Sequence, residues 1–197
     1  QARRALETIQ DATAKALGAL PSEVIFTSGA TESNHTALGS ITRMMELERP
    51  VRWAIGAGEH PSVMRAAEQL NEAGLATYRL VQLLPSGQVD PDDLEAALES
   101  CDALCLQVAN HETGVITDLN EVAKSVQEHS VIWHADAVQA VGRIPFLFNE
   151  SGAEQITSAS ISGHKLGGPR GVGVLLWRAN QPFIPLLPDS ADTGRAR

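Results

Sequence analysis

The feature that most limits the fold of this chain is a regular alternation of short apolar segments with longer amphipathic ones. Segments with the composition of strands occupy 23–27, 51–57, 76–81, 103–109, 131–135, 155–161 and 172–177. Segments with helical periodicity occupy 2–17, 28–47, 61–71, 91–100 and 119–128, and a short helical turn is expected at 136–141. This alternation predicts an α/β fold, a mostly parallel seven-stranded sheet with helices on both faces.

The size and composition of the chain fit one globular domain with a sizeable core. It has 197 residues, of which 43% are hydrophobic, enough to build a single packed sheet. We expect residues 1–180 to form one large domain. The polar segment 181–197 is expected to begin a connection to a smaller C-terminal domain, because both ends of the sequence look cut.

Charge and hydrophobicity exclude two classes of partner. The formal net charge is −9 and no basic stripe is present, which argues against a nucleic-acid partner. No apolar run approaches the ~20 residues that span a bilayer, which argues against a membrane partner. The two cysteines, Cys101 and Cys105, are too few for a disulfide scaffold and fit a reducing cytoplasm.

Polar and glycine-rich segments follow five of the predicted strands. Because ligands of such sheets bind outside the carboxyl ends of the strands, we expect these segments to meet at one rim. They are Gly29–Thr31, Glu59–His60, Asn110–His111, Asp136 with Gln139, and Ser162–Lys165.

The segment 161–177 places Lys165 between a strand and a cluster of glycines. A Walker loop needs its lysine directly after the last glycine, and a dinucleotide fingerprint needs a helix after the glycines. Neither pattern is present. Lys165 is then either a solvated loop residue or an amine held, and partly desolvated, to form a Schiff base.

The other rim groups also have two interpretations each. Ser28–Thr31 opens a helix with free backbone N–H groups, a site suited to phosphate, or else Ser28 or Thr31 caps that helix. Asp136 either pairs with a cation such as a pyridinium nitrogen or caps a turn, and Gln139 would share its face. His60 either stacks on a flat ring or caps its helix. Together these groups meet the requirements of pyridoxal 5'-phosphate (PLP).

Five motifs carry a family resemblance over nearly all of residues 1–180. The chain resembles the class V aminotransferase fold, and specifically the cysteine desulfurases of the iron–sulfur-cluster and nitrogen-fixation type. The motifs are Thr27-Ser-Gly-Ala-Thr-Glu-Ser33, Glu59-His60, Asn110-His-Glu-Thr-Gly114, His134-Ala-Asp-Ala-Val-Gln139 and Ser162-Gly-His-Lys165.

The resemblance implies a role for each matching residue. Lys165 and His60 would be catalytic, with Lys165 binding PLP covalently and His60 stacking on its ring and assisting proton transfer. Asp136 would pair with the pyridine nitrogen and Gln139 with the ring hydroxyl. The remaining cofactor-binding positions would be Ala30, Thr31, Asn110, Ser162, Gly163 and His164.

The resemblance also implies the reaction and the partners. Sulfur would be removed from L-cysteine to give alanine and an enzyme persulfide, in a homodimer that passes sulfur to an acceptor protein for iron–sulfur cluster assembly. Cys105 is predicted to lie roughly 17 Å from the rim, so the nucleophilic cysteine is expected beyond this sequence. His111 departs from the family pattern, where a second asparagine is frequent.

Three alternatives remain open. The first is another class V PLP enzyme, a selenocysteine lyase or an aminotransferase, and the second is a catalytically incomplete PLP-binding remnant. The third is a metal-dependent hydrolase with His60, His134, Asp136 and His164 as ligands. We expect His134 and Asp136 to point to opposite faces of their strand, which disfavours the third alternative.

Overall fold

The computed structural model describes residues 2–150 and 152–186, and within them seven strands form one sheet. The strand order is β1-β7-β6-β5-β4-β2-β3. Strands β2 to β6 run parallel, and β7 is antiparallel to both of its neighbours. The mostly parallel seven-stranded sheet is therefore confirmed. The strands are β1 (Val24–Thr27), β2 (Val51–Gly56), β3 (Ala76–Val81), β4 (Ala103–Cys105), β5 (Ile132–Asp136), β6 (Ile156–Ser162) and β7 (Gly173–Trp177).

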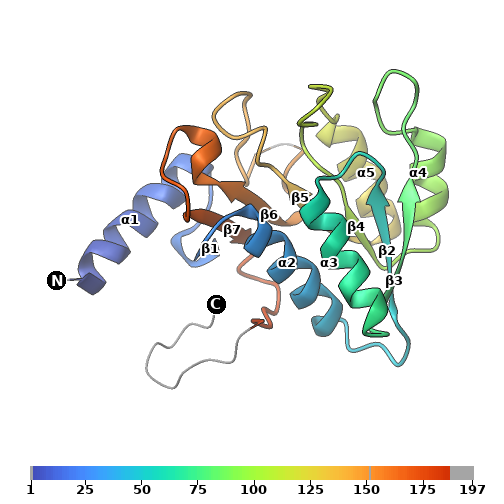
Figure 1. Cartoon of the computed structure of the whole chain (residues 1–197), viewed down its shortest axis with the longest axis horizontal. Coiled ribbons are helices and arrows are strands. Elements are labelled where there is room, and N and C mark those ends of the chain that lie inside the picture. Colours follow the sequence, from blue (N-terminus) through green and yellow to red (C-terminus); the bar gives the residue numbers. More distant parts are fainter. Residues whose placement is uncertain (1, 151, 187–197) are drawn as a thin grey trace.

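Helices cover both faces of the sheet, as Figure 1 shows: α2 and α3 lie side by side over one face, and α4 and α5 over the other. The helices are α1 (Ala2–Leu17), α2 (Ala30–Met44), α3 (Pro61–Glu72), α4 (Pro91–Leu98) and α5 (Leu119–His129), with two short 3-10 helices, η1 (Pro21–Glu23) and η2 (Gly163–Leu166).

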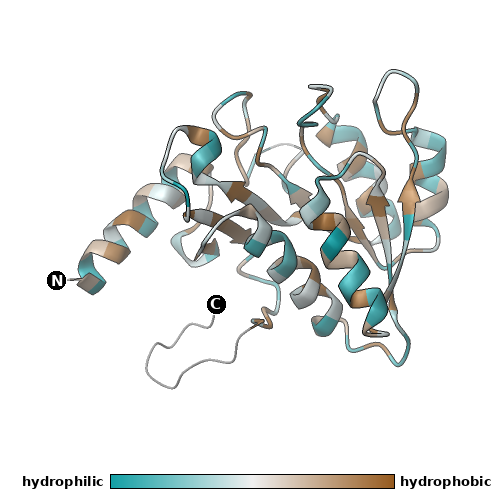
Figure 2. Cartoon of the chain, viewed as in Figure 1, coloured by the Kyte–Doolittle hydropathy of each residue, from teal (hydrophilic) through white to brown (hydrophobic). Residues whose placement is uncertain are grey.

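Successive side chains of a central strand enter opposite cores. Trp53 and Ile55 of β2 pack with the helices α2 and α3, whereas Ala54 between them packs with α4 and α5. This is the two-residue alternation of a strand that is covered on both sides. Figure 2 shows the result as hydrophobic strands between helices whose outer surfaces are hydrophilic.

Two predicted elements differ from the observed ones. The regular strand β4 ends at Cys105, not near Ala109, although the N–H groups of Leu106 and Val108 still bond the carbonyls of His134 and Asp136. Residues 138–143 form a series of turns and no regular helix, although the N–H of Val141 bonds the carbonyl of Ala137 as in a single helical turn. Both changes occur where the chain leaves the sheet at its rim. The backbone there is irregular, and it forms part of the wall of the site and not a regular helix or strand.

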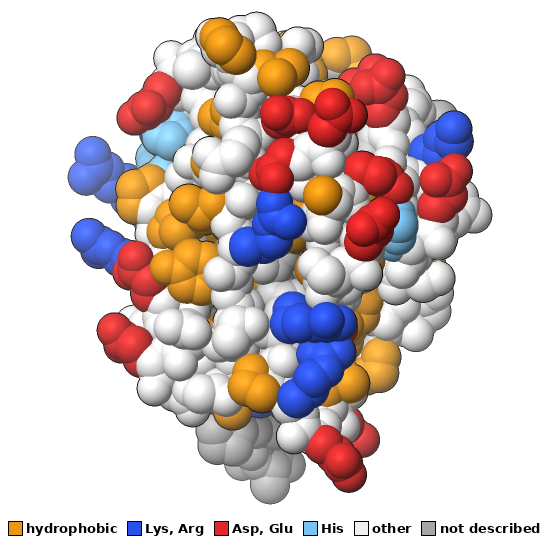
Figure 3. Space-filling view, turned by 90° about the vertical axis from the view of Figure 1, so that its right-hand side faces the viewer, with side chains coloured by type: hydrophobic (Ala, Val, Ile, Leu, Met, Phe, Trp, Pro, Cys, Tyr) orange, Lys and Arg blue, Asp and Glu red, His pale blue; other side chains and the backbone are white. Residues whose placement is uncertain are grey.

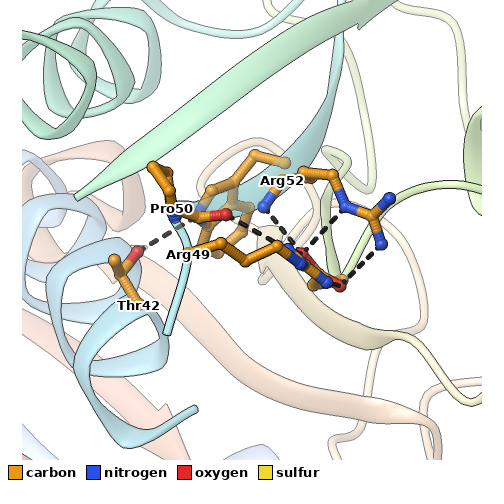
Figure 4. A network of polar contacts seen from close by, with 6 residues as sticks. Thr42, Arg49, Pro50 and Arg52 are labelled. Carbon is orange, nitrogen blue, oxygen red and sulfur yellow. Dashed lines mark hydrogen bonds and ion pairs between the residues drawn. The ribbon is translucent and has the colours of Figure 1, made fainter. Parts of the chain in front are cut away.

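Charged residues stabilise the sheet away from the rim. Asp102, the residue before β4, accepts hydrogen bonds from Arg49, which precedes Pro50, and from Arg52 of β2 (Figure 4). This pairing, led by Arg49, holds the pKa of Asp102 well below its usual range. The network ties the start of β2 to the start of β4, at the edge of the sheet opposite the rim.

The β3 edge of the sheet is protected by charge. Arg79 of β3 forms an ion pair with Asp93 of α4, and charged side chains on an edge strand discourage pairing with another chain. Figure 3 shows this side of the molecule, where acidic side chains gather in the upper part and basic ones in the middle and lower parts.

The described end of the chain packs back on the domain. The N–H of Ile184 donates to Ser40 Oγ of α2, and Phe183 lies edge-on to Trp177 with ring centroids 5.1 Å apart. The rest of the predicted connection, residues 187–197, lies outside the described residues. None of the described helices is both long and apolar enough to cross a membrane.

Candidate PLP-binding site

A cavity of about 530 Å³ opens at the carboxyl ends of the strands. Its lining comes from the segments that follow β1, β2, β4, β5 and β6, so the five strand ends singled out in the sequence do converge. The predicted residues that line it are Ala30, Thr31, His60, Asp136, Gln139, Ser162, His164 and Lys165. Its volume is in the range of small-molecule sites.

The first turn of α2 is open toward this cavity. Its N-cap is Gly29, and no side chain caps the helix, so the interpretation of Ser28 or Thr31 as a cap is wrong. The ideal Cβ position of Gly173 on β7 lies only 2.5 Å from Gly29 Cα. The absence of a side chain at Gly173 lets the α2 N-terminus sit directly against β7, with its N–H groups available to an anion.

Asp136 closes the floor of the cavity at the end of β5. Its side chain is 7% exposed. One oxygen accepts a hydrogen bond from Asn34 Nδ2 at 3.0 Å, and the other from the N–H of Val138 at 3.0 Å. Burial raises the pKa of Asp136, while these two bonds oppose the rise. Within the described residues no cationic side chain forms an ion pair with it.

His60 lies on the cavity wall at the start of α3. It does cap the helix, because its Nδ1 accepts a hydrogen bond from the N–H of Ser62. Its ring also meets that of His111 edge-on, with centroids 5.3 Å apart. Desolvation lowers the pKa of His60, although the charge of Asp136 opposes the change. The two interpretations of His60 are therefore compatible.

Lys165 is held through its backbone. It lies in η2, and its carbonyl accepts a hydrogen bond from Arg143 at 2.8 Å. The side chain is exposed, so the partial desolvation expected from the sequence is not observed in this chain. Beside it, Ser162 Oγ and His164 Nδ1 lie 2.9 Å apart, which puts two more hydrogen-bonding groups next to the amine.

Two predicted site residues do not line the cavity. Asn110 donates to the carbonyl of Gly58 and accepts from the N–H groups of Glu112 and Thr113, so its amide organises its own loop. Gly163 lies behind the lysine, where its N–H bonds the carbonyl of Val172. We therefore do not retain a direct cofactor contact for Asn110 or Gly163.

Sequence reasoning missed several residues of the cavity wall. Ser62, Gln107 and Arg170 line it, and Arg170 adds an exposed cation at the mouth. Its place in the segment Gly168-Pro-Arg-Gly171, which begins three residues after Lys165, is a signal that could have identified it. Ser62 lies inside a helix and gave no such signal.

The metal-site alternative is not supported. No group of three or more candidate ligands occurs among the described residues. Our expectation that His134 and Asp136 face opposite ways was wrong: they are two residues apart on a strand, so they share a face. Both in fact bond Asn34.

The donor set fits PLP. An uncapped helix N-terminus suits the phosphate, and a lysine suits the aldehyde. A buried carboxylate that has no ionic partner in the described part of the chain suits a protonated pyridine nitrogen. His60 offers an aromatic face between them. The fold and this arrangement define the large domain of the PLP-dependent transferases, an assignment that structural similarity supports.

The chain belongs to the aminotransferase class V family, whose sequence profile matches residues 1–190. It is 38% identical over 190 residues to a cysteine desulfurase of Nostoc sp., covering 95% of this chain and 46% of that protein. It is also 38% identical to an IscS-like cysteine desulfurase of Mycobacterium tuberculosis, covering 94% and 48%. The chain thus spans about half the length of these relatives.

Solved structures show the same fold. A NifS-like protein superposes with a TM-score of 0.84 at 31% identity, covering 95% of this chain and 51% of the other. A structure described as SspA in complex with cysteine superposes with a TM-score of 0.85 at 27% identity, covering 94% and 53%.

Proposed function

We propose that this chain forms the PLP-binding part of a cysteine desulfurase. The reaction takes sulfur from L-cysteine and transfers it to an enzyme thiol, so that alanine and an enzyme persulfide are the products. The observation that carries the proposal is the cavity in which Lys165, Asp136 and the open α2 N-terminus meet. The names of the relatives support this substrate over other amino acids.

Each cavity group has a separate task in this proposal. Bound PLP would supply an electron-withdrawing ring that acidifies the Cα–H of the amino acid. The α2 N-terminus, with Ser162 and His164, would bind the phosphate. Asp136 would accept a hydrogen bond from the pyridine nitrogen, and Gln139, half-buried beside it, would bond the ring hydroxyl.

Two groups would move protons. The amine of Lys165 would hold PLP covalently and, once released by the substrate, transfer a proton at the substrate Cα. His60 would cover one face of the PLP ring and assist proton transfer to or from the substrate on that side. The homodimer, the sulfur-acceptor protein and the cytoplasmic location inferred from the sequence remain predictions of this proposal.

The test of the proposal is the covalent bond to Lys165. Protein mixed with PLP should develop a visible absorbance band, and borohydride should fix the pyridoxyl group to the peptide that contains Lys165. The variant Lys165→Ala should lose the band and the modified peptide. Lys124, the other lysine of the second half of the chain, lies on α5 away from the cavity, and Lys124→Ala is the matched control.

The result that would contradict the proposal is equally definite. A folded protein that binds no PLP, or a pyridoxyl group fixed to another lysine, would rule out the site. If PLP binds but L-cysteine yields no alanine while another amino acid is transaminated, the fold assignment stands and the enzyme is a different class V member.

A further inference from the structure

Asn34 is a buried polar residue that connects three groups around the cavity floor. It lies within α2 and is fully buried. Its Nδ2 donates to Asp136 Oδ2 at 3.0 Å and to Ser62 Oγ at 2.9 Å, and its Oδ1 lies 3.0 Å from His134 Nε2. Both N–H groups of its amide, and the amide oxygen, thus take part in hydrogen bonds.

The chemistry of these partners determines which way each hydrogen points. An ionised Asp136 only accepts, so the NH₂ of Asn34 must face it and the carbonyl oxygen must face His134. His134 then carries its proton on Nε2. Its Nδ1, 2.8 Å from Ser158 Oγ, accepts from that hydroxyl. Burial lowers the pKa of His134 to about 3, so its ring is neutral at neutral and mildly acidic pH.

The same order continues to His60. Because Ser62 Oγ accepts from Asn34, its own hydrogen is directed to His60 Nδ1 at 2.8 Å, and that nitrogen also receives the N–H of Ser62 at 3.1 Å. Two donors pointing at Nδ1 leave the proton of a neutral His60 on Nε2. Within the described residues, His60 Nε2 has no hydrogen-bond partner, so it is the nitrogen left to the cavity.

We propose that Asn34 is a positioning residue that orders the protons of the PLP site. It holds Asp136 as an ionised acceptor, and through Ser62 it makes His60 a hydrogen-bond donor toward the cavity. The role rests on the proposed function, because only a ligand with a ring nitrogen makes use of Asp136 in this way. The hydrogen-bond order itself is a property of the chain and is measurable without PLP.

The reverse order is chemically possible and makes the proposal falsifiable. If Asp136 were protonated, Asn34 could turn its oxygen toward it and its NH₂ toward His134, whose proton would then sit on Nδ1. The tautomer of His134 therefore reports the charge of Asp136. The charged and titratable groups that act on His60 are Asp136, His111 and Lys165, and those that act on Asp136 are His60, His111 and Glu59.

Nitrogen NMR of the ring atoms decides between the two orders. In ¹⁵N-labelled, cofactor-free protein the six histidines are assigned with single His→Gln variants. We expect His134 to stay neutral with its proton on Nε2 between about pH 5.5 and 8, and neutral His60 to be protonated on Nε2. A His134 proton on Nδ1 in the wild-type protein would overturn the proposal, even if Lys165 binds PLP as proposed.

Two variants separate the branches of the network. Ser62→Ala removes one donor to His60 and should raise the pKa of His60 by about 0.5 to 1 unit, with His134 unchanged. Asn34→Leu should alter the ring signals of both histidines and, in the PLP-bound protein, shift the pH midpoint of the visible band by about one unit or more.

The matched control lies on the same helix. Thr42→Val removes a buried hydroxyl that accepts a hydrogen bond from Trp53 Nε1, outside the cavity, and should lower stability without moving any of these signals. Equal effects of Thr42→Val and Asn34→Leu would overturn the proposal. If Asn34→Leu does not fold, the wild-type tautomer and Ser62→Ala still decide it, because an unchanged His60 in Ser62→Ala contradicts the ordering.

Discussion

Two buried carboxyl groups, Asp136 at the cavity floor and Glu59 near it, differ in their hydrogen-bond partners. Asp136 accepts two hydrogen bonds, whereas Glu59 accepts one from the N–H of Gln107, and its Oε2 has no partner among the residues that the structure describes. Burial, with the charge of Asp136 as a second cause, raises the pKa of Glu59 to about 8. At neutral pH Glu59 is therefore protonated, which avoids placing two negative charges in one buried region.

This difference predicts a pH-dependent stability. Folded protein keeps the Glu59 proton up to about pH 8, but the unfolded chain loses it near 4.5. Between these values Glu59 holds its proton only in the folded state, so the contribution of Glu59 to the free energy of unfolding falls as pH rises, by on the order of a few kcal/mol. Glu59→Gln imitates the protonated form and should remove this slope.

The measurement is urea unfolding of wild-type and Glu59→Gln protein at about pH 5 and pH 8. The variant should be the more stable of the two at the higher pH. Glu72→Gln, at an exposed glutamate in α3, is the control and should behave as wild type. A Glu59→Gln protein that loses stability with pH as steeply as the wild type would show that Glu59 is ionised.

A second prediction at the scale of residues concerns Asp136. Asp136→Asn keeps the size of the side chain but removes the charge that favours a protonated ring nitrogen, an effect of one to three pKa units. The variant should retain bound PLP and exchange the Cα–H of amino acids about 10- to 1000-fold more slowly. Exchange in D₂O, followed by proton NMR, measures this, and wild-type rates would remove the role of Asp136.

At the scale of elements, the close contact between β7 and the start of α2 builds the anion site. Gly173→Ala would bring a methyl group within 2.5 Å of Gly29 Cα, and because the neighbour is backbone, α2 must move away from the sheet. We expect a loss of about 1–3 kcal/mol in stability. We also expect PLP affinity to fall at least about tenfold, which corresponds to about 1.4 kcal/mol.

Urea unfolding and an absorbance titration with PLP test this contact. The control is Val172→Ala, the neighbouring residue, whose side chain is 43% exposed and leaves Gly29 untouched. Normal PLP affinity in a folded Gly173→Ala protein would show that the α2 N-terminus does not hold the phosphate.

At the scale of the whole molecule, the two cysteines are built into the packing and not into the site. Cys105 is fully buried in β4, and burial raises the pKa of its thiol well above the usual value. Burial also raises the pKa of Cys101, to about 11. Nucleophilic sulfur chemistry needs an accessible thiolate, so neither residue suits the step that forms a persulfide.

The double variant Cys101→Ala/Cys105→Ala tests this in the longest available version of the protein. Alanine production from L-cysteine should stay within about twofold of wild type, while stability falls by ~1 kcal/mol from the buried sulfur atom lost at Cys105. Loss of activity in a folded variant, or persulfide on either cysteine, would place the nucleophile within these 197 residues.

The part of the site that followed from the sequence consists of residues directly after strands. Lys165, Asp136 and His60 were identified because the carboxyl ends of parallel strands share one edge, so their order along the chain predicts their meeting. Asn34 and Ser62 lie inside helices, where a polar residue is normally solvent-facing. Asn110 occupies a strand end like the others, yet its amide is used by its own loop.

The sequence by itself determined the kind and order of the elements, because hydrophobic periodicity is a local property that survives in any packing. It also determined which residue types could meet at the rim. Only the tertiary structure decided that Glu59 is buried and protonated, that Asp136 and His134 share Asn34, and that Lys165 is exposed in this chain. Burial and hydrogen-bond partners come from residues far apart in sequence, such as Asn34 and Asp136, and no local pattern records those contacts.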